Sequence, residues 1–346
     1  MSDIMIKGID KKQNRKSVFG KSVAVLTAAG VLASFCCGCS SIKDKFGLGT
    51  EYVFQVSGEK CEPGEAKVIL LNYQKEYGNA YGVDLWSHDY GKDMSLEQYV
   101  KDLTLSQLAE VYTLDAIAEE QEVELSEEEQ TKVSQAAEEY YNGLSEEENA
   151  YLGIGKEEVQ KLYERYVLAQ KLYYQLTESV EQEVSDDEAR VMQAKQIFTA
   201  DESKAQDALQ QLQGGTEFAS VAASFNEADA VDLTVNRSSF AEDVIEQVFA
   251  LKDGTYSSVI STEKGYYIFY CVKSYDPDLT QAHKADVLEK RMEEAVNGTY
   301  NSYASEADSS LNQTVWEEIT VDTSLKTEGS SFLEIYEKYF PGEEKK

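Results

Sequence analysis

The chain has 346 residues, of which 64 are acidic and 32 are basic, so its formal net charge at pH 7 is −32. A surface this acidic repels nucleic acid and anionic lipid headgroups, so neither is an expected partner. Hydrophobic residues make up 42% of the chain, which is enough for folded cores, and the length favours two domains.

The amino-terminal residues have the layout of a secretory signal. Residues 1–21 carry six basic and two acidic side chains, and residues 22–35 form an apolar run without a charge. This run of about 14 residues is shorter than the ~20 that a membrane-spanning helix needs. A basic segment followed by a short apolar run is typical of a cleaved signal peptide.

The end of this run resembles a bacterial lipobox. Cys39 follows the small residue Gly38 and precedes two serines, whereas bulky Phe35 stands before the alternative, Cys36. Cysteines occupy the two positions before Gly38, where a lipobox usually has leucine and then alanine or serine. We expect residues 1–38 to be a lipoprotein signal peptide and Cys39 to carry the lipid. An ordinary secretory signal with cleavage nearby is the alternative.

A lipid on Cys39 would have a physical consequence. Diacylglycerol supplies two acyl chains, which anchor a protein stably, whereas one chain gives only marginal binding. Residues 39–50 would then form a tether, and the protein would lie on the extracytoplasmic face of the cell membrane. After residue 38 the chain holds 62 acidic and 26 basic residues, a net charge of −36, which favours solubility beside the membrane.

Residues 51–185 predict a mainly helical domain. It opens with partial alternation of apolar residues over 51–61, which indicates a short strand, and it becomes helical from Pro63. Three later helices each begin with a serine that is followed three residues on by Gln or Glu, the pattern of a capping box. The expected helix starts are Ser95, Ser126, Ser145 and, without such a box, Lys156.

The pattern changes over residues 186–275, which predict short strands and helices in the order β-α-α-α-β-β. Its strands are expected at 190–198, 256–260 and 265–272, and its helices at 201–213, 218–225 and 244–251. The last part, residues 276–346, predicts a long helix at 278–307, a strand around Trp316 at 314–321 and an amphipathic turn over 332–340. The expected fold class is therefore α+β.

Cysteine and histidine are too sparse to form a disulfide framework or a metal site. Beyond Cys39 only Cys61 and Cys271 remain, in different predicted domains, so a disulfide between them is not expected. The two histidines, His88 and His283, have no metal-ligand spacing with these cysteines, and we expect no metal.

Two stretches of the 186–275 segment resemble the parvulin family. The first matches the helix that presents spaced apolar residues, and the second matches the carboxy-terminal signature of the family. The matching positions are Gly215, Phe218, Val221, Ala222 and Phe225, and then Phe249, Leu251, Gly254, Ser257, Ile260, Thr262, Gly265, Tyr266 and Ile268. The flanking regions resemble PrsA/SurA-type foldases, in which a parvulin module is inserted into a mainly helical, SurA-N-like chaperone domain formed by both flanks.

The resemblance implies a peptidylprolyl cis-trans isomerase that acts on unfolded or newly secreted polypeptides. Uncatalysed rotation about an X-Pro bond takes tens to hundreds of seconds. A parvulin needs no cofactor: its site holds the proline ring in an apolar pocket and stabilises the twisted amide more than the planar forms. In the family, two histidines and an Asp or Cys form a hydrogen-bonded cluster beneath that pocket.

The sequence departs from the family at this cluster. The family's histidine positions fall on Gln196 and Tyr267, its acid position falls near Ala228 or Asp229, and Asp232 keeps part of a neighbouring family motif. We take Gln196, Asp232 and Tyr267 as the degenerate catalytic positions.

The pocket positions of the family stay apolar. We expect Phe240, Val244 and Ile268 to bind the substrate.

Two interpretations stay open. Gln196 and Tyr267 can both donate and accept hydrogen bonds, so weak isomerase activity can survive. Alternatively, the module is a non-catalytic platform or spacer, and a Tyr-rich helical domain holds clients as a chaperone. A solute-capturing lipoprotein is disfavoured, because such proteins alternate strands and helices where residues 60–180 predict helices only.

Overall fold

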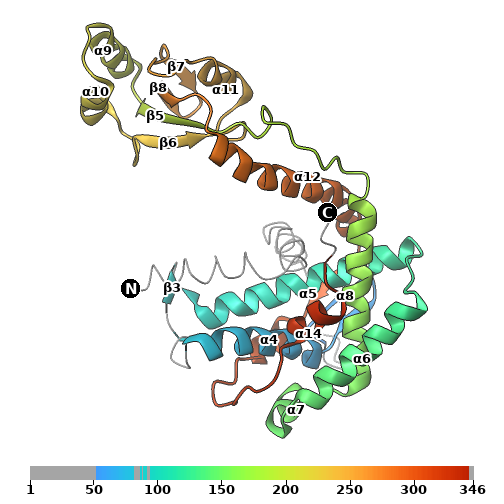
Figure 1. Ribbon diagram of the computed structural model, residues 1–346. Helices are drawn as coiled ribbons and strands as arrows, with labels where there is room; N and C mark the ends of the chain where they lie inside the picture. The colour runs from blue at the N-terminus through green and yellow to red at the C-terminus, as the bar shows by residue number, and fades with distance from the viewer. Residues whose placement is uncertain (1–51, 82–85, 88, 92–93, 343–346) are drawn as a thin grey trace. The chain divides into compact units, whose positions relative to one another are not determined.

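The computed structural model describes residues 52–81, 86–87, 89–91 and 94–342, and these form two compact units. The described residues before Val180 and those from Glu293 onward make up the first unit, and Val180–Met292 make up the second. Helices accompany antiparallel sheets in the chain, so the expected α+β class is confirmed (Figure 1). The predicted signal peptide and Cys39 lie outside the described residues.

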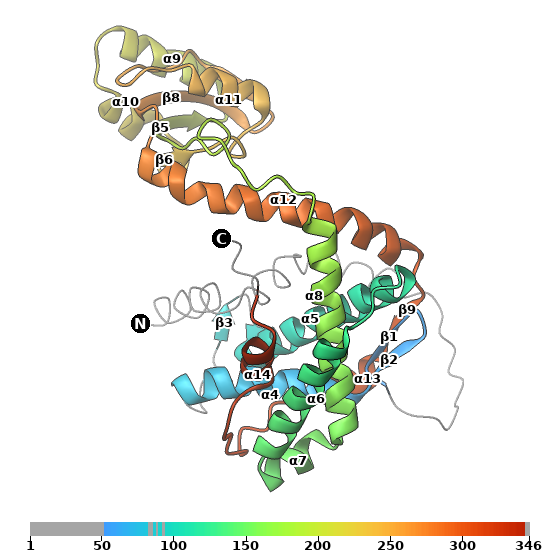
Figure 2. The same cartoon turned by 45° about the vertical axis from the view of Figure 1, so that its right-hand side comes forward.

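The first unit contains a small sheet built from both ends of the chain. Strands β1 (Phe54–Val56) and β2 (Glu59–Cys61) form a hairpin, and β9 (Ser309–Leu311) pairs antiparallel with the other edge of β1 (Figure 2). The prediction of one strand over 51–61 is wrong, because Ser57 and Gly58 both have positive φ and turn the chain within two residues.

Helices make up most of the first unit. They are α4 (Pro63–Tyr81), α5 (Leu96–Glu120), α6 (Glu127–Gly143), α7 (Glu146–Leu152) and α8 (Lys156–Thr177), and a two-stranded pair β3 (Asp89–Gly91) and β4 (Met94–Ser95) precedes α5. The predicted serine caps are confirmed: Ser95 accepts a hydrogen bond from the Gln98 backbone, and Ser126 and Ser145 form complete capping boxes. Each such cap contributes ~1 kcal/mol to helix stability.

The carboxy-terminal segment returns to complete this helical core. The segment around Trp316 is helix α13 (Gln313–Glu318), not the predicted strand, because Asn312 caps it by accepting a hydrogen bond from the Val315 backbone. Helix α14 (Phe332–Tyr339) follows, as the amphipathic pattern indicated. The ring of Phe332 is fully buried and stacks on Tyr163 of α8 with centroids 4.0 Å apart.

A buried ion pair fastens the segment that leads into α14. Lys75 of α4 and Glu148 of α7 lie 2.9 Å apart and are almost completely buried. The Lys75 ammonium also donates to the carbonyl of Glu328 at 2.6 Å, and Asn72 accepts from the Leu333 backbone at 2.9 Å. Segments more than 250 positions apart in the sequence thus share one core.

The tyrosines of the helical unit are core residues. Most of those on α5, α6, α8 and α14 are buried, and four of them pack with Phe332 in one group of rings, Tyr140, Tyr163, Tyr166 and Tyr336. The buried ones are Tyr112, Tyr140, Tyr163, Tyr166, Tyr173 and Tyr336. They therefore do not form the exposed Tyr-rich surface that a chaperone interpretation of this domain would use.

The second unit is a four-stranded antiparallel sheet with helices on both faces. Its strands, in the order β6-β5-β8-β7, are β5 (Met192–Thr199), β6 (Asp232–Val235), β7 (Ile260–Thr262) and β8 (Gly265–Lys273), and its helices are α9 (Glu202–Gln213), α10 (Phe218–Phe225) and α11 (Glu242–Phe249). The order is thus β-α-α-β-α-β-β. The predicted order lacked β6. Of the predicted strand at 256–260, only Ile260 lies in a strand, β7, and Tyr256 makes an isolated bridge with Tyr270.

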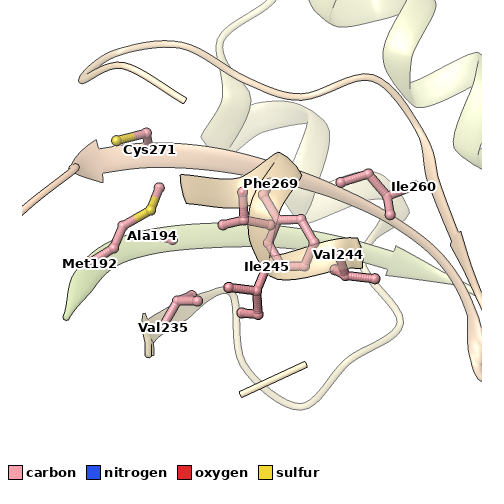
Figure 3. Packing of buried hydrophobic residues seen from close by; sticks show 9 residues of the cluster. Met192, Ala194, Val235, Val244, Ile245, Ile260, Phe269 and Cys271 are labelled. Carbon is pink, nitrogen blue, oxygen red and sulfur yellow. The ribbon is translucent and has the colours of Figure 1, made fainter. Parts of the chain in front are cut away.

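Alternation along the central strands divides the second unit into two cores. Ala194, Phe269 and Cys271 pack against α11 (Figure 3). Ile197 and Ile268 face the other way, into the core formed by α9 and α10. The long helix α12 (Pro277–Glu306) follows β8 and supplies residues to both units.

Candidate functional site

Two of the predicted site residues lie on the face of the sheet that α11 covers. Gln196 of β5 is paired with Phe269 of β8, and two residues further along Phe198 is paired with Tyr267. Directly paired residues of an antiparallel sheet point to the same side, and side chains two positions apart share a face. These four side chains therefore project from one face, the one that carries Phe269 and Cys271.

Four aromatic rings meet on this face, and we call Phe198, Phe240, Tyr267 and Phe269 the aromatic cluster. The ring of Tyr267 lies 4.7 Å from Phe198, 5.5 Å from Phe240 and 5.4 Å from Phe269, measured between centroids. Phe269 is fully buried, whereas the other three rings are only partly covered. The cluster thus has a buried base and partly exposed rings at the surface.

The aromatic cluster packs against the hydrophobic core between the sheet and α11. Val244 of α11 and Ile260 of β7 are each 3% exposed and pack in the same core as Phe269. Val244 is therefore part of the floor of the site and not of its exposed wall.

A glycine allows β8 to begin against Phe198. Gly265 has a φ of +141°, and a Cβ there would lie 2.7 Å from the carbonyl oxygen of Thr199 and 2.8 Å from the Phe198 ring. Contacts below 3.0 Å force a neighbour to move. The absence of a side chain at Gly265 therefore lets the ring of Phe198 pack beside Tyr267.

Gln196 is engaged with the neighbouring loop. Its side-chain amide donates to the carbonyl of Ala230 at 2.9 Å, and its backbone donates to the carbonyl of Val231 at 2.8 Å. In the part of the chain that the structure describes, the Tyr267 hydroxyl makes no hydrogen bond. Burial raises the pKa of Tyr267 above its usual value, so its hydroxyl stays protonated at neutral pH. Gln196 and Tyr267 share a face but do not form a hydrogen-bonded pair.

The loop at the family's acid position is fixed by Asn226. Its side-chain oxygen accepts from the backbone of Phe198 at 3.0 Å, and its amide donates to the carbonyl of Ala228 at 2.9 Å. The next residue, Glu227, accepts from Lys204, and this hydrogen bond is the largest contribution that lowers the pKa of Glu227 to about 2. The Glu227 carboxylate is therefore paired with a lysine on α9.

Two predicted site residues lie elsewhere. Asp232 pairs with Lys195 on the opposite face of the sheet and forms an ion pair with it, and its side chain is 78% exposed. Ile268 is fully buried in the core that α9 and α10 form. The structure thus brings together Gln196, Tyr267, Phe240 and Val244 and separates them from Asp232 and Ile268.

Sequence reasoning missed Phe198 and Phe269. Both follow from alternation, because each lies two residues from a predicted site residue on the same strand.

The arrangement can bind an apolar or ring-shaped group, because such a group would remove the partly exposed aromatic surface from water, which is favourable in free energy. The polar groups beside it are an amide that is already bonded and a neutral phenol. In the described residues no group of three or more His, Cys, Asp or Glu side chains could hold a metal ion.

Comparison with known families identifies the region that contains this site. Residues 154–284 match the family described as the PPIC-type PPIASE domain. This segment runs from just before α8 to the first turns of α12 and includes the whole four-stranded sheet. The resemblance to the parvulin family is therefore confirmed over these residues. Among curated proteins none matches the chain.

Solved structures of foldases resemble the chain more distantly. The peptidylprolyl isomerase PrsA of Bacillus anthracis is 17% identical, with 57% of this chain and 97% of that one covered and a TM-score of 0.35. PrsA of Bacillus cereus is 12% identical, with 84% and 98% covered and a TM-score of 0.37. A SurA-like chaperone of Campylobacter jejuni is 10% identical, with 76% and 100% covered and a TM-score of 0.28.

Proposed function

We propose that the protein is a membrane-anchored folding factor outside the cytoplasm that binds unfolded segments of secreted proteins at the aromatic cluster of its PPIC-type domain. One observation carries the proposal: three partly exposed rings gather on one face of the sheet, over a packed core. Partly exposed aromatic side chains that lie together mark binding surfaces more often than lone exposed ones do.

The same geometry favours binding over rapid isomerisation. Stabilising a twisted amide requires polar groups directed at it. The Gln196 amide already donates to the carbonyl of Ala230, and Tyr267 supplies a single neutral hydroxyl. We therefore infer that any turnover of X-Pro bonds is slow and that client binding is the main role. Isomerase activity is the second candidate function, which the family match favours.

The membrane anchor in this proposal rests on the sequence around Cys39. None of the helices in the described residues is long and apolar enough to cross a membrane. Replacing Cys39 by alanine should release the protein from the membrane fraction of the cells that make it.

The main experiment uses the chain from residue 39 onward, with Cys39→Ala so that it is made without lipid. Binding of a reduced, carboxymethylated client is measured by fluorescence anisotropy, and turnover of a proline peptide is measured in a protease-coupled assay. We expect Tyr267→Ala and Phe240→Ala to weaken client binding and Tyr267→Phe, which keeps the ring, to preserve it.

Phe249→Ala is the matched control, because Phe249 is also partly buried in this core but does not belong to the aromatic cluster. If it weakens binding as much as Phe240→Ala does, loss of folding explains both results and the site is refuted. Substantial proline turnover that Tyr267→Phe abolishes would instead establish the isomerase function.

A further inference from the structure

A groove is lined by residues of the first unit alone, whereas the aromatic cluster belongs to the second unit. It has a volume of about 910 Å³, which is within the range of natural ligand sites. Its walls come from the turn between β1 and β2, from the last turn of α5 and from the last turns of α12 (Figure 2).

All the charge in this groove is negative. Glu120, Glu306 and Asp308 line it, and no Lys, Arg or His is among its lining residues. Helices α5 and α12 both end here, and neither has a basic residue in its last turn. Because the carboxyl end of a helix carries a partial negative charge, the two helix ends add to the potential of the three carboxylates.

Small residues leave the groove open. A Cβ added to Gly58 or Gly298 would meet no atom within 4 Å, so neither glycine is covered by a neighbouring side chain. Ser302 and Ala307 are the adjacent lining residues on the α12 side.

Hydrogen bonds fix the walls relative to each other. The Tyr303 hydroxyl of α12 lies 2.7 Å from the Ser57 hydroxyl, and the Ser57 backbone donates to the carbonyl of Asp308 at 2.8 Å. A cavity whose walls are already held in place loses little conformational entropy when it binds.

We propose that this groove binds extended, lysine- or arginine-containing segments of unfolded polypeptides. The inference rests on the proposed function for the nature of the client, but it assigns a second site of different chemistry. A second copy of the chain is disfavoured as the occupant, because each copy carries a net charge of −32. A single divalent cation is disfavoured by the size of the groove and by the absence of a three-ligand group in the described residues.

The test measures binding of a fluorescein-labelled peptide of three Lys-Gly-Ser repeats to the chain from residue 39 onward, with Cys39→Ala, at low ionic strength. We expect the triple variant Glu120→Gln, Glu306→Gln, Asp308→Asn to weaken binding at least 10-fold. The magnitude follows because a water-exposed carboxylate about 4 Å from a cation contributes about fivefold to affinity. A peptide in which glutamate replaces lysine should not bind.

A matched triple variant separates the groove from the general acidity of the chain. Glu138→Gln, Glu147→Gln, Glu178→Gln removes the same charge from exposed positions of the first unit outside the groove. We expect it to change the affinity less than twofold. Equal weakening by the two triple variants would overturn the proposal, as would no binding by the wild type.

A second pair of variants tests shape without changing charge. Ser302→Trp fills the groove from α12, whereas Asn301→Trp places the same ring on the neighbouring exposed position, which does not line it. Only Ser302→Trp should reduce peptide binding, and unchanged affinity would refute the groove as the site. These results are independent of the Phe240 and Tyr267 variants, so failure of the groove leaves the aromatic cluster to its own test.

Discussion

Glu110 gives the first unit a pH dependence whose direction follows from its burial. This residue of α5 is 3% exposed, and its Oε1 atom is buried without a hydrogen-bond partner. Burial raises the pKa of Glu110 well above its usual value of 4.5. Its charge acts on Tyr166 of α8 and on Tyr300 of α12, neither of which is a cation. The folded chain therefore holds this carboxyl in its neutral form.

The sign of the effect follows from the raised pKa. In the unfolded chain the carboxyl ionises above pH 4.5, whereas in the folded chain it keeps its proton to higher pH. The contribution of Glu110 to the free energy of unfolding is therefore highest below pH 4.5, where the carboxyl is neutral in both states. It falls as the pH rises towards the pKa of the folded state. With 1.36 kcal/mol for each pH unit between the unfolded and the folded pKa, the loss at pH 7 is on the order of a few kcal/mol at most.

Glu110→Gln removes this ionisation and keeps the shape of the side chain. We expect its stability relative to the wild type to rise between pH 5 and pH 7, by at most ~1 kcal/mol for each pH unit. Both tryptophans, Trp86 and Trp316, belong to the first unit, so urea unfolding followed by tryptophan fluorescence reports on that unit.

The control is Glu119→Gln, on the exposed side of the same helix. It should leave the pH dependence unchanged. If the wild type and Glu110→Gln give parallel stability curves over this pH range, the carboxyl is already ionised in the folded chain and the reasoning is refuted.

Two further substitutions test the packing of each unit. Gly265→Ala should destabilise the second unit by more than ~1 kcal/mol, because its φ is +141° and the added Cβ would clash with Thr199 and Phe198. Far-UV circular dichroism during denaturation checks this, and an unchanged transition would contradict the clash. Phe332→Ala should cost the first unit about 3–5 kcal/mol, since the ring is fully buried against Tyr163. Tryptophan fluorescence measures it, and a loss below ~1 kcal/mol would show that α14 is not part of the core.

Structural features that depend only on residues close together in the sequence could be predicted. The helix starts after Ser95, Ser126 and Ser145 follow from a side chain that satisfies a backbone group three residues away. The signal is complete within four residues, so no knowledge of the tertiary structure is needed.

Short strands with distant partners could not be predicted in the same way. Strand β9 has three residues and pairs with β1, which lies about 250 positions earlier. Strand β6 has four residues, and its outward positions Asp232 and Thr234 are polar because β6 is an edge strand. Neither segment is long enough to show a periodicity, and both are strands because a partner supplies their hydrogen bonds.

In the candidate site, too, the sequence could not predict which single residues come together, because this depends on the pairing of distant strands. Alignment with family motifs led to Tyr267 and to Ile268, which are adjacent in β8. Adjacent residues of a strand point to opposite faces, and so Ile268 lies in the other core while Tyr267 joins the aromatic cluster. A motif gives the position along the chain, whereas the register of β5 and β8 decides which side chains meet.

Tyr267 also determines what chemistry this face can support. The family's histidine at this position would change charge near neutral pH. Burial raises the pKa of Tyr267, so here the position presents a neutral hydroxyl that is able to donate a hydrogen bond to a bound group but does not act as a base. Its ring meanwhile contacts Phe198 and Phe240 and adds apolar surface to the cluster. Under the proposed function, the tyrosine at this position supplies contact area in place of proton chemistry, which suits a site that holds client segments more than one that turns over their proline bonds.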